Sequence, residues 1–512
     1  MAMKAYAPSL HWQTAIFAAG LAMFFGLAAS LGSPLLVAFL VALALAGVLA
    51  ASPVALLWLV VIGGLVFAGV AELYFPAIRQ ARWGVVIVSA GLGLVAVLSA
   101  GWQRETRRGS KPEPWPSVVV FAVIFFLIAL FSGVLNLGMT MDTAVGFKGY
   151  FQVWSILLAF ALLPLRPPAA ERFMASLVWL GLLQFPFILH QHFVLVPQRL
   201  GATDAAKGIV AQDVLVGTFT GSMDGGGAGP AMAVLLLVAL MISIAYWRCG
   251  RMSLLRLGAL ALVLLLPMAI GEHKIVLVLL PLGLVLVFED KILQSPLRAM
   301  GLLSIAACVV ALMFMVFTLL PRGDNSRPLT PGEYLEQMLA YNVGDRGYGN
   351  ALLNRTTVYP FWANYQQSGS GSVINTLIGY GPGASKDPRG SLAEHSLSSE
   401  RFPRYGIGLT GISGLLWDVG LLGTIAAAGF FVSAYRMARR LVREAPPKTL
   451  RWAHLKGAEA GAAMMGLSLL HNNMFLFEIG FQTLLMVLVG YLIYARRSYA
   501  IPNANGGVPP RK

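Results

Sequence analysis

The segment from Pro321 to Gly408 decides how this chain folds. It contains PRGDNSRPLTPGEYLEQ (321–337), GNALLNRTTVYPFW (349–362) and LIGYGPGASKDPRGSLAEHS (377–396), and it runs into SERFPRYGIGLTG (399–411). These polar, turn-rich residues form the one large segment that is unsuited to lipid, because apolar runs surround it on both sides. We therefore expect any chemistry outside a bilayer to take place in this segment or directly beneath it.

The composition is typical of an integral membrane protein. Of the 512 residues, 57% are hydrophobic and only 12% are charged, and the mean hydropathy is +0.74. A soluble domain carries roughly 25% charged residues. Cys249 and Cys308 form neither a disulfide framework nor a zinc motif. The sequence has no Gly-Lys-Ser/Thr phosphate loop, which argues against an ATP-driven machine.

The predicted fold is an all-α polytopic membrane protein of about 14 transmembrane helices with one large external loop domain. A span needs about 20 mostly apolar residues, and the first apolar run is expected to remain as a span because no cleavage site closely follows it. The predicted organisation is helices 1–11 in residues 1–320, the loop domain in 321–408, helices 12–14 in 409–495 and a disordered tail in 496–512. The expected spans lie near 12–30, 34–50, 53–71, 83–101, 117–138, 149–165, 173–196, 228–247, 254–270, 275–289, 299–320, 409–435, 453–470 and 474–495.

Lysine and arginine cluster in alternate loops, as they do on the cytoplasmic side of membrane proteins. With the N-terminus inside, these clusters fall on one side at 104–111, 166–172, 248–256, 291–298, 436–456 and 496–497. Both termini then face the cytoplasm, and the net charge of +15 reports topology, with no nucleic acid expected as a partner. The polar segments on the outer face are 198–227, 271–274, 321–408 and 471–473.

Two cations on this outer face are candidates for binding an anion. Glu272, His273 and Lys274 separate ALVLLLPMAI from IVLVLLPLGLVLVF, and ionisable groups at such a boundary are costly unless they face water or a polar site. The group is either a hairpin turn with snorkelling side chains or a cation facing an anionic headgroup or substrate. Arg355 precedes the aromatic cluster Tyr-Pro-Phe-Trp, which suits a membrane interface. Its planar fork matches phosphate oxygens, although it could equally pair with a loop carboxylate.

Two histidines on the outer face could act as a general base. His395 lies in a charged stretch and could equally be a solvated loop residue, and His471 could equally cap a helix or bond between helices. The Gly-Tyr-Gly-Pro-Gly sequence around Tyr380 predicts a tight turn. The charged neighbours of His395 are Glu394, Glu400, Arg401 and Arg404.

The order of these elements is more specific than any one of them. A basic residue at the outer turn of an apolar hairpin is followed by R-x(6)-W (355–362), then LIGYGPG (377–383), then WDVGLLG (417–423). This series resembles the O-antigen ligase and O-antigen polymerase superfamily, which are bacterial inner-membrane glycosyltransferases acting on undecaprenyl-diphosphate-linked sugars. The similar segments run from about Gly271 to Gly423.

The resemblance implies a GT-C-like fold with a periplasmic loop domain, and catalysis at the periplasmic face without metal, nucleotide or other cofactor. A sugar hydroxyl would attack the anomeric carbon of the lipid-linked donor, and the diphosphate would leave. Lys274 and Arg355 would bind that diphosphate, and His395 would take the hydroxyl proton. The further residues expected around the substrate are Glu272, His273, Tyr380, Arg401, Arg404 and His471.

The chain also departs from the family pattern. The family often has a His-Asn pair about eleven residues before its Gly-Leu-Leu-Gly element, but Leu409 and Thr410 stand there. The base is therefore open between His395, His471, Glu272 and Glu400.

Polymerisation of lipid-linked repeat units into an exopolysaccharide, capsule or O-antigen is the leading function implied by the resemblance. A ligase that moves a finished glycan to a lipid A core or another acceptor is its alternative. A glycolipid transporter or flippase and a non-catalytic scaffold are alternatives from other classes. The implied partners are the undecaprenyl-diphosphate-linked oligosaccharide, the bilayer, a chain-length regulator, a flippase and other polysaccharide assembly proteins. The loop domain holds eight cations and seven acids, so it should act through a few placed cations.

Overall fold

Helix is the only regular secondary structure in the residues that the computed structural model describes. These are residues 52–106, 114–136, 140–201, 211–320, 329–344, 346–348, 351–369, 371–386 and 395–500. Within them, eight helices are long and apolar enough to cross a membrane, and a pair bent by 42° makes a ninth if it is one span. The chain is therefore an all-helical, multi-pass membrane protein.

Each expected span that falls in the described residues overlaps one or more helices. The eight are Pro53–Tyr74, Pro76–Gly101, Ser117–Leu135, Pro167–Leu200, Gly229–Arg248, Pro296–Leu319, Gly420–Glu444 and Ile479–Ser498, and the bent pair is Asp142–Tyr150 with Ser155–Leu162. The remaining three are α12 (Leu254–Ile270), α13 (Val276–Val287) and α22 (Leu450–Ser468). The expected spans 12–30 and 34–50 lie outside the described residues, so the total of about fourteen stays a prediction.

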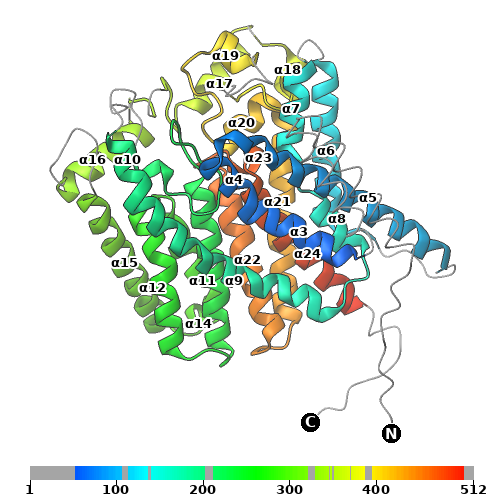
Figure 1. Ribbon diagram of the computed structural model, residues 1–512, viewed down its shortest axis with the longest axis vertical. Helices are drawn as coiled ribbons and strands as arrows, with labels where there is room; N and C mark the ends of the chain where they lie inside the picture. Colours follow the sequence, from blue (N-terminus) through cyan, green and yellow to red (C-terminus); the bar gives the residue numbers. More distant parts are fainter. Residues whose placement is uncertain are drawn as a thin grey trace.

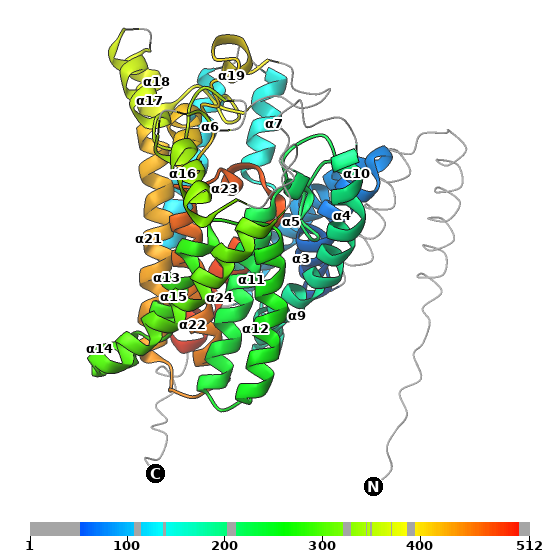
Figure 2. The ribbon, with the colours of Figure 1, turned by 90° about the vertical axis from the view of Figure 1, so that its left-hand side faces the viewer.

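The helices run between two ends of different character (Figures 1 and 2). At one end lie α17 (Val358–Gln367), α18 (Val373–Ile378) and α19 (Leu397–Arg401), all from the 321–408 segment, and we call this the cap end. The opposite end carries α14 (Glu289–Gln294) and the turn from α11 (Gly229–Arg248) to α12. The basic clusters at 248–256 and 291–298 thus lie away from the cap.

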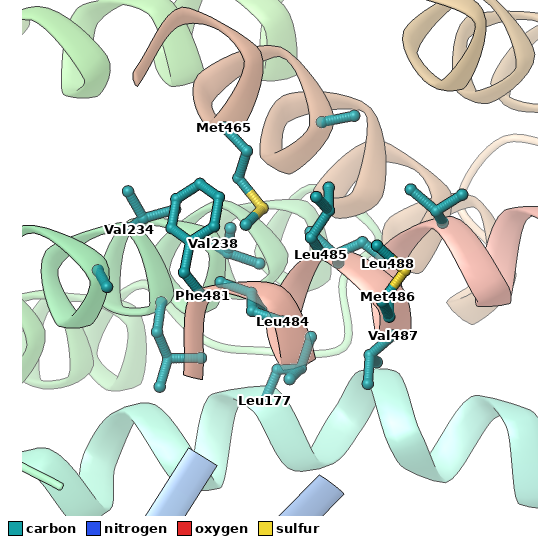
Figure 3. Close-up of a cluster of buried hydrophobic side chains, with 14 of the residues drawn as sticks. Leu177, Val234, Val238, Met465, Phe481, Leu484, Leu485, Met486, Val487 and Leu488 are labelled. Atoms are coloured by element: carbon teal, nitrogen blue, oxygen red, sulfur yellow. The ribbon is translucent and has the colours of Figure 1, made fainter. Parts of the chain in front are cut away.

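Two helices form the centre of the bundle. In α11 and α24 (Ile479–Ala500), 89% and 94% of the span is buried, against 22% in α15 (Pro296–Leu319). Figure 3 shows side chains of α24 packed against α11, α22 and α9 (Pro167–His190). Small residues permit this close packing: a Cβ on Gly457 of α22 would lie 2.3 Å from Ile242 of α11.

Helix α24 also corrects two predicted boundaries. The expected span 474–495 begins later, because the short helix α23 (Met474–Phe477) precedes α24. The first residues of the expected tail 496–512 are helical, since α24 continues to Ala500, and residues 501–512 lie outside the described residues.

A second apolar cluster lies beneath the cap. Trp417 of α20 (Gly411–Asp418) is fully buried, and its ring centroid lies 5.2 Å from that of Phe402 and 5.3 Å from that of Tyr365. Trp362 and Ile407 complete this contact. The cap is therefore fixed to the membrane helices by aromatic packing.

The expected span 409–435 is broken. Helix α20 ends at Asp418, and α21 (Gly420–Glu444) starts at a glycine with φ of +66°. A Cβ on Gly420 would lie 2.4 Å from the carbonyl carbon of Leu377. Only glycine fits this position, because it combines a left-handed backbone with close contact to the cap.

Candidate functional site

Lys274 lies in the turn between α12 and α13, towards the cap end. Its ammonium is 3.2 Å from the Glu272 carboxylate, which also accepts a 2.8 Å hydrogen bond from the Tyr334 hydroxyl. The same ammonium is 5.5 Å from the centroid of the Tyr334 ring. Tyr334 belongs to α16 (Pro331–Asn342) and packs on Phe314 of α15. The 321–408 segment therefore meets the α12–α13 turn directly.

Arg355 is held by groups that carry no formal charge. Its Nε donates to the backbone carbonyl of His471 at 2.7 Å, and its Nη1 donates to Asn342 Oδ1 at 2.6 Å. The guanidinium also lies 4.1 Å from the centroid of the Tyr348 ring. Within the described residues, no carboxylate forms an ion pair with Arg355. The guanidinium is half-buried, so it is positioned while its charge is available to a ligand.

His471 joins the two cations into one cluster. It lies in the loop between α22 and α23. Burial lowers the pKa of His471, and the positive charges of Arg355 and Lys274 lower it further, to about 3. The ring is therefore neutral near pH 7. Three residues singled out from distant parts of the sequence thus share one site, which we call the Lys274–Arg355–His471 cluster.

The 198–227 loop also reaches this cluster. Burial and, to a smaller extent, the Glu272 charge raise the pKa of Asp213 to about 6, against the lowering effects of Arg199 and Lys274. Lys274 acts on both Asp213 and His471, so both residues lie within electrostatic range of its ammonium. The cluster therefore combines cations with carboxylates.

His273 does not share the setting of its neighbours. Only 7% of the residue is exposed, and burial lowers the pKa of its ring to about 4. The ring fills the space beside two glycines, since a Cβ on Gly229 or Gly271 would lie within 2.5 Å of it. This position makes His273 part of the packing beneath Lys274, and its contact with substrate stays a prediction.

The other predicted residues lie elsewhere in the cap. His395 is 71% exposed, with its Nδ1 3.4 Å from Glu400. Arg401 donates to the Tyr365 hydroxyl at 3.2 Å, and Arg404 is exposed, with a φ of +67°. In the part of the chain that is described, no contact joins these residues to the Lys274–Arg355–His471 cluster. Glu394 lies outside the described residues.

Tyr380 lies in the glycine-rich turn, which closes over Asp418. The Asp418 carboxylate accepts hydrogen bonds from the Gly383 N–H at 2.9 Å, the Ser385 N–H at 2.6 Å and the Tyr150 hydroxyl at 2.8 Å. The Tyr380 N–H donates to the Trp417 carbonyl at 2.9 Å. The LIGYGPG and WDVGLLG segments are therefore in contact, and Asp418 fixes the turn.

Sequence reasoning missed several members of the site. Tyr334 and Asn342 lie on α16, a helix that no apolar run in the sequence predicts. A signal for this helix was present, because Thr330 and Glu333 form a capping box. Asp213 carried no local signal, since its role depends on contact with the α12–α13 turn.

Comparisons with known proteins do not assign this chain to a family. No family model matches the chain, and no curated protein matches it. No group of three or more His, Cys, Asp or Glu residues that could hold a metal ion occurs in the described ranges. The functional argument therefore depends on the residues of the site.

Proposed function

We propose that this chain is a membrane glycosyltransferase that polymerises lipid-linked oligosaccharide repeat units at the cap end. The donor is a glycan on undecaprenyl diphosphate, and the product is an exopolysaccharide, capsule or O-antigen. The observation that carries the proposal is the Lys274–Arg355–His471 cluster. It places two cations within electrostatic range of one neutral histidine, at the end opposite the basic loops at 248–256 and 291–298.

The two cations suit a leaving diphosphate. Arg355 offers a guanidinium that no described carboxylate neutralises, and Lys274, paired with Glu272, adds a compact charge that acts on the same histidine. Fixed cations that face developing negative charge are among the largest contributions to catalysis. Glu272 and Tyr334 hold Lys274, while Asn342 and the His471 carbonyl hold Arg355.

The reaction balances without a further reagent. The acceptor hydroxyl oxygen forms a bond to the anomeric carbon, and the bond from that carbon to the diphosphate oxygen breaks. The diphosphate leaves with the electron pair of that bond, and the hydroxyl proton passes to a base.

His471 is the base that this geometry favours. In the free protein its ring is neutral, so one ring nitrogen can accept a proton. Burial is the largest cause of its low pKa, and the charges of Arg355 and Lys274 lower the pKa further. A diphosphate would neutralise these two charges, so substrate binding would raise this pKa by removing their contribution. His395, the first choice from the sequence, lies outside the cluster and stays an alternative.

The membrane orientation follows from the charges. Basic loops favour the cytoplasm, so the cap end faces the periplasm of a bacterial inner membrane and both termini are cytoplasmic. About fourteen spans are expected in the whole chain. A chain-length regulator and a flippase are expected partners by analogy.

Incubation of the purified protein with a single lipid-linked repeat unit tests the proposal. A ladder of longer lipid-linked products supports the polymerase. Products that appear only after lipid A core is added support the ligase alternative. The absence of any new glycosidic bond in both reactions contradicts glycosyl transfer.

A glycolipid transporter is the second candidate, and one observation favours it. Lys456 and Glu459 of α22 are buried and form a 2.7 Å ion pair. The pair lies inside the bundle towards the end opposite the cap, since the Lys456 ammonium is also 3.9 Å from the Glu289 carboxylate of α14. Buried charges within a membrane bundle often mark a transport path. Glycolipid movement across proteoliposomes without new glycosidic bonds, abolished by Glu459→Gln, would establish this candidate in place of the transferase.

A further inference from the structure

The elbow between α14 and α15 forms a groove at the end opposite the cap. Ser295 joins the two helices in an extended conformation, and Pro296 begins α15. A residue before proline disfavours the helical conformation, whereas proline suits the first position of a helix. The Ser-Pro sequence therefore separates the two helices, and Figure 2 shows α14 turned away from the bundle.

One face of α15 lines this groove. The four lining residues of α15 follow the spacing i, i+3, i+4 and i+7, which places them on one side of the helix. Gly301 keeps the groove open, because a Cβ there would meet nothing within 4 Å outside its own helix. The groove has a volume of about 300 Å³, and its lining residues are Phe288, Lys291, Arg298, Gly301, Leu302 and Ile305.

Two of the lining residues are cations whose charges nearby acids do not cancel. Lys291 is half-exposed and Arg298 is exposed. The two acids of α14, Glu289 and Asp290, already pair with arginines of α21 and α11. Within the described ranges, no carboxylate forms an ion pair with Lys291 or Arg298. The groove therefore combines an apolar floor with positive charge.

The groove lies where a membrane helix meets the lipid–water boundary. Arg298 is in the first turn of α15, a helix long enough to cross a membrane. Large apolar side chains beside the cations are exposed: Leu293 and Leu297 by 78% each, and Met300 by 64%. Basic pockets at such a boundary bind the headgroups of anionic lipids. The cations and the apolar floor thus match the two parts of an anionic lipid.

We propose that this groove binds one anionic phospholipid of the phosphatidylglycerol type. Its phosphate contacts Lys291 and Arg298, where the arginine offers several donors to phosphate oxygens. One acyl chain lies along Gly301, Leu302 and Ile305. A zwitterionic lipid fits less well, because the cation of its headgroup is repelled by the same two side chains. The site is remote from the Lys274–Arg355–His471 cluster and does not depend on the proposed function.

A lipid titration of the purified full-length protein, followed by native mass spectrometry, tests this proposal. We expect one tightly held phosphatidylglycerol in the wild type. Its affinity should fall roughly 25-fold in K291Q/R298Q, because each Lys or Arg near an anionic lipid surface contributes about fivefold. R251Q/R256Q is the matched control, since it removes two exposed cations from the same end of the bundle outside the groove, and it should bind like the wild type.

Gly301→Leu tests the apolar floor without a change of charge. Leucine favours a helix more than glycine does, so the fold should be retained. The new side chain would displace at least one methylene of the acyl chain, whose burial contributes about fourfold in affinity. Gly258→Leu is the control, because a Cβ on this glycine of α12 also meets nothing within 4 Å.

The unfolding temperature gives an independent measurement, since a ligand that binds the folded state stabilises it. Phosphatidylglycerol should raise this temperature in the wild type more than in K291Q/R298Q. Equal affinity of these two proteins for phosphatidylglycerol would overturn the proposal. Equal weakening in R251Q/R256Q would also overturn it, because the attraction would then belong to the whole basic surface. Equal affinity of the wild type for phosphatidylcholine would refute the role of the two cations.

Discussion

Replacement of Arg355 by alanine separates a ligand-binding arginine from a structural one. Two of its donors bind His471 and Asn342 in the free protein, and the rest of its charge has no described carboxylate partner. If that charge stabilises the leaving diphosphate, its loss should slow turnover by roughly 10²–10³, as for one removed electrostatic donor. This corresponds to about 3–4 kcal/mol of transition-state stabilisation. A loss of about tenfold is the smallest effect that agrees with this role.

The assay is the rate of ladder formation from a single lipid-linked repeat, at saturating and at low substrate. Asn342→Ala is the matched control for structure, because it removes the 2.6 Å hydrogen bond but keeps the charge of Arg355. We expect it to cost less than about tenfold, since a single hydrogen bond to a charged group contributes about 1.5–3 kcal/mol when buried and less when half-exposed. Arg346→Ala removes an exposed cation nearby and should retain activity.

Two results would refute this reasoning. Full activity of a folded, correctly inserted Arg355→Ala protein would remove the arginine from the site. Equal losses of activity in Arg355→Ala and Asn342→Ala would show that Arg355 only connects α16 to the loop at His471 and does not bind the ligand. Arg355→Lys gives a third comparison, because it keeps the charge but loses the planar fork, so its rate should lie between wild type and alanine.

Three further predictions concern the supports of the site. Asp418→Ala leaves three donors without their acceptor, two of them buried, and should destabilise the fold by about 3–5 kcal/mol, measured as a lower unfolding temperature in detergent. Gly379→Ala places a Cβ 2.3 Å from the Asp418 backbone at a φ of +78° and should unfold at lower temperature, whereas Gly91→Ala, with open space around its Cβ, should not. The pKa of Asp213 in the folded protein is raised to about 6 from an ordinary 3.8, so the stability that its protonated form contributes below about pH 3.8 is lost as the pH rises through about 6. Asp213→Asn should therefore make the unfolding temperature depend less on pH across this window. An unchanged pH dependence of the unfolding temperature would contradict the assignment.

The membrane helices could be predicted from sequence because of a strong physical constraint. In lipid, every backbone polar group must be satisfied within the segment, so long apolar runs become helices. The break at Gly420 could not be predicted in the same way. It depends on the approach of Leu377 from the cap, which is a contact between distant segments.

The site was predicted in part. Lys274, Arg355 and His471 were recognisable from the sequence because charged or titratable groups beside apolar runs cost free energy unless they face water or a polar site. Their common location, and the contributions of Tyr334, Asn342 and Asp213, come from tertiary contacts that sequence spacing does not encode.

Mass analysis of the lipid-linked products formed by the purified wild-type protein tests the central claim most directly. The substrate is one repeat unit on undecaprenyl diphosphate, and the protein is supplied alone. The account predicts a lipid-linked dimer with an equal amount of free undecaprenyl diphosphate, and neither product from K274A/R355A. Repeat units that remain unchanged with the wild type, with and without an added core acceptor, would contradict the account.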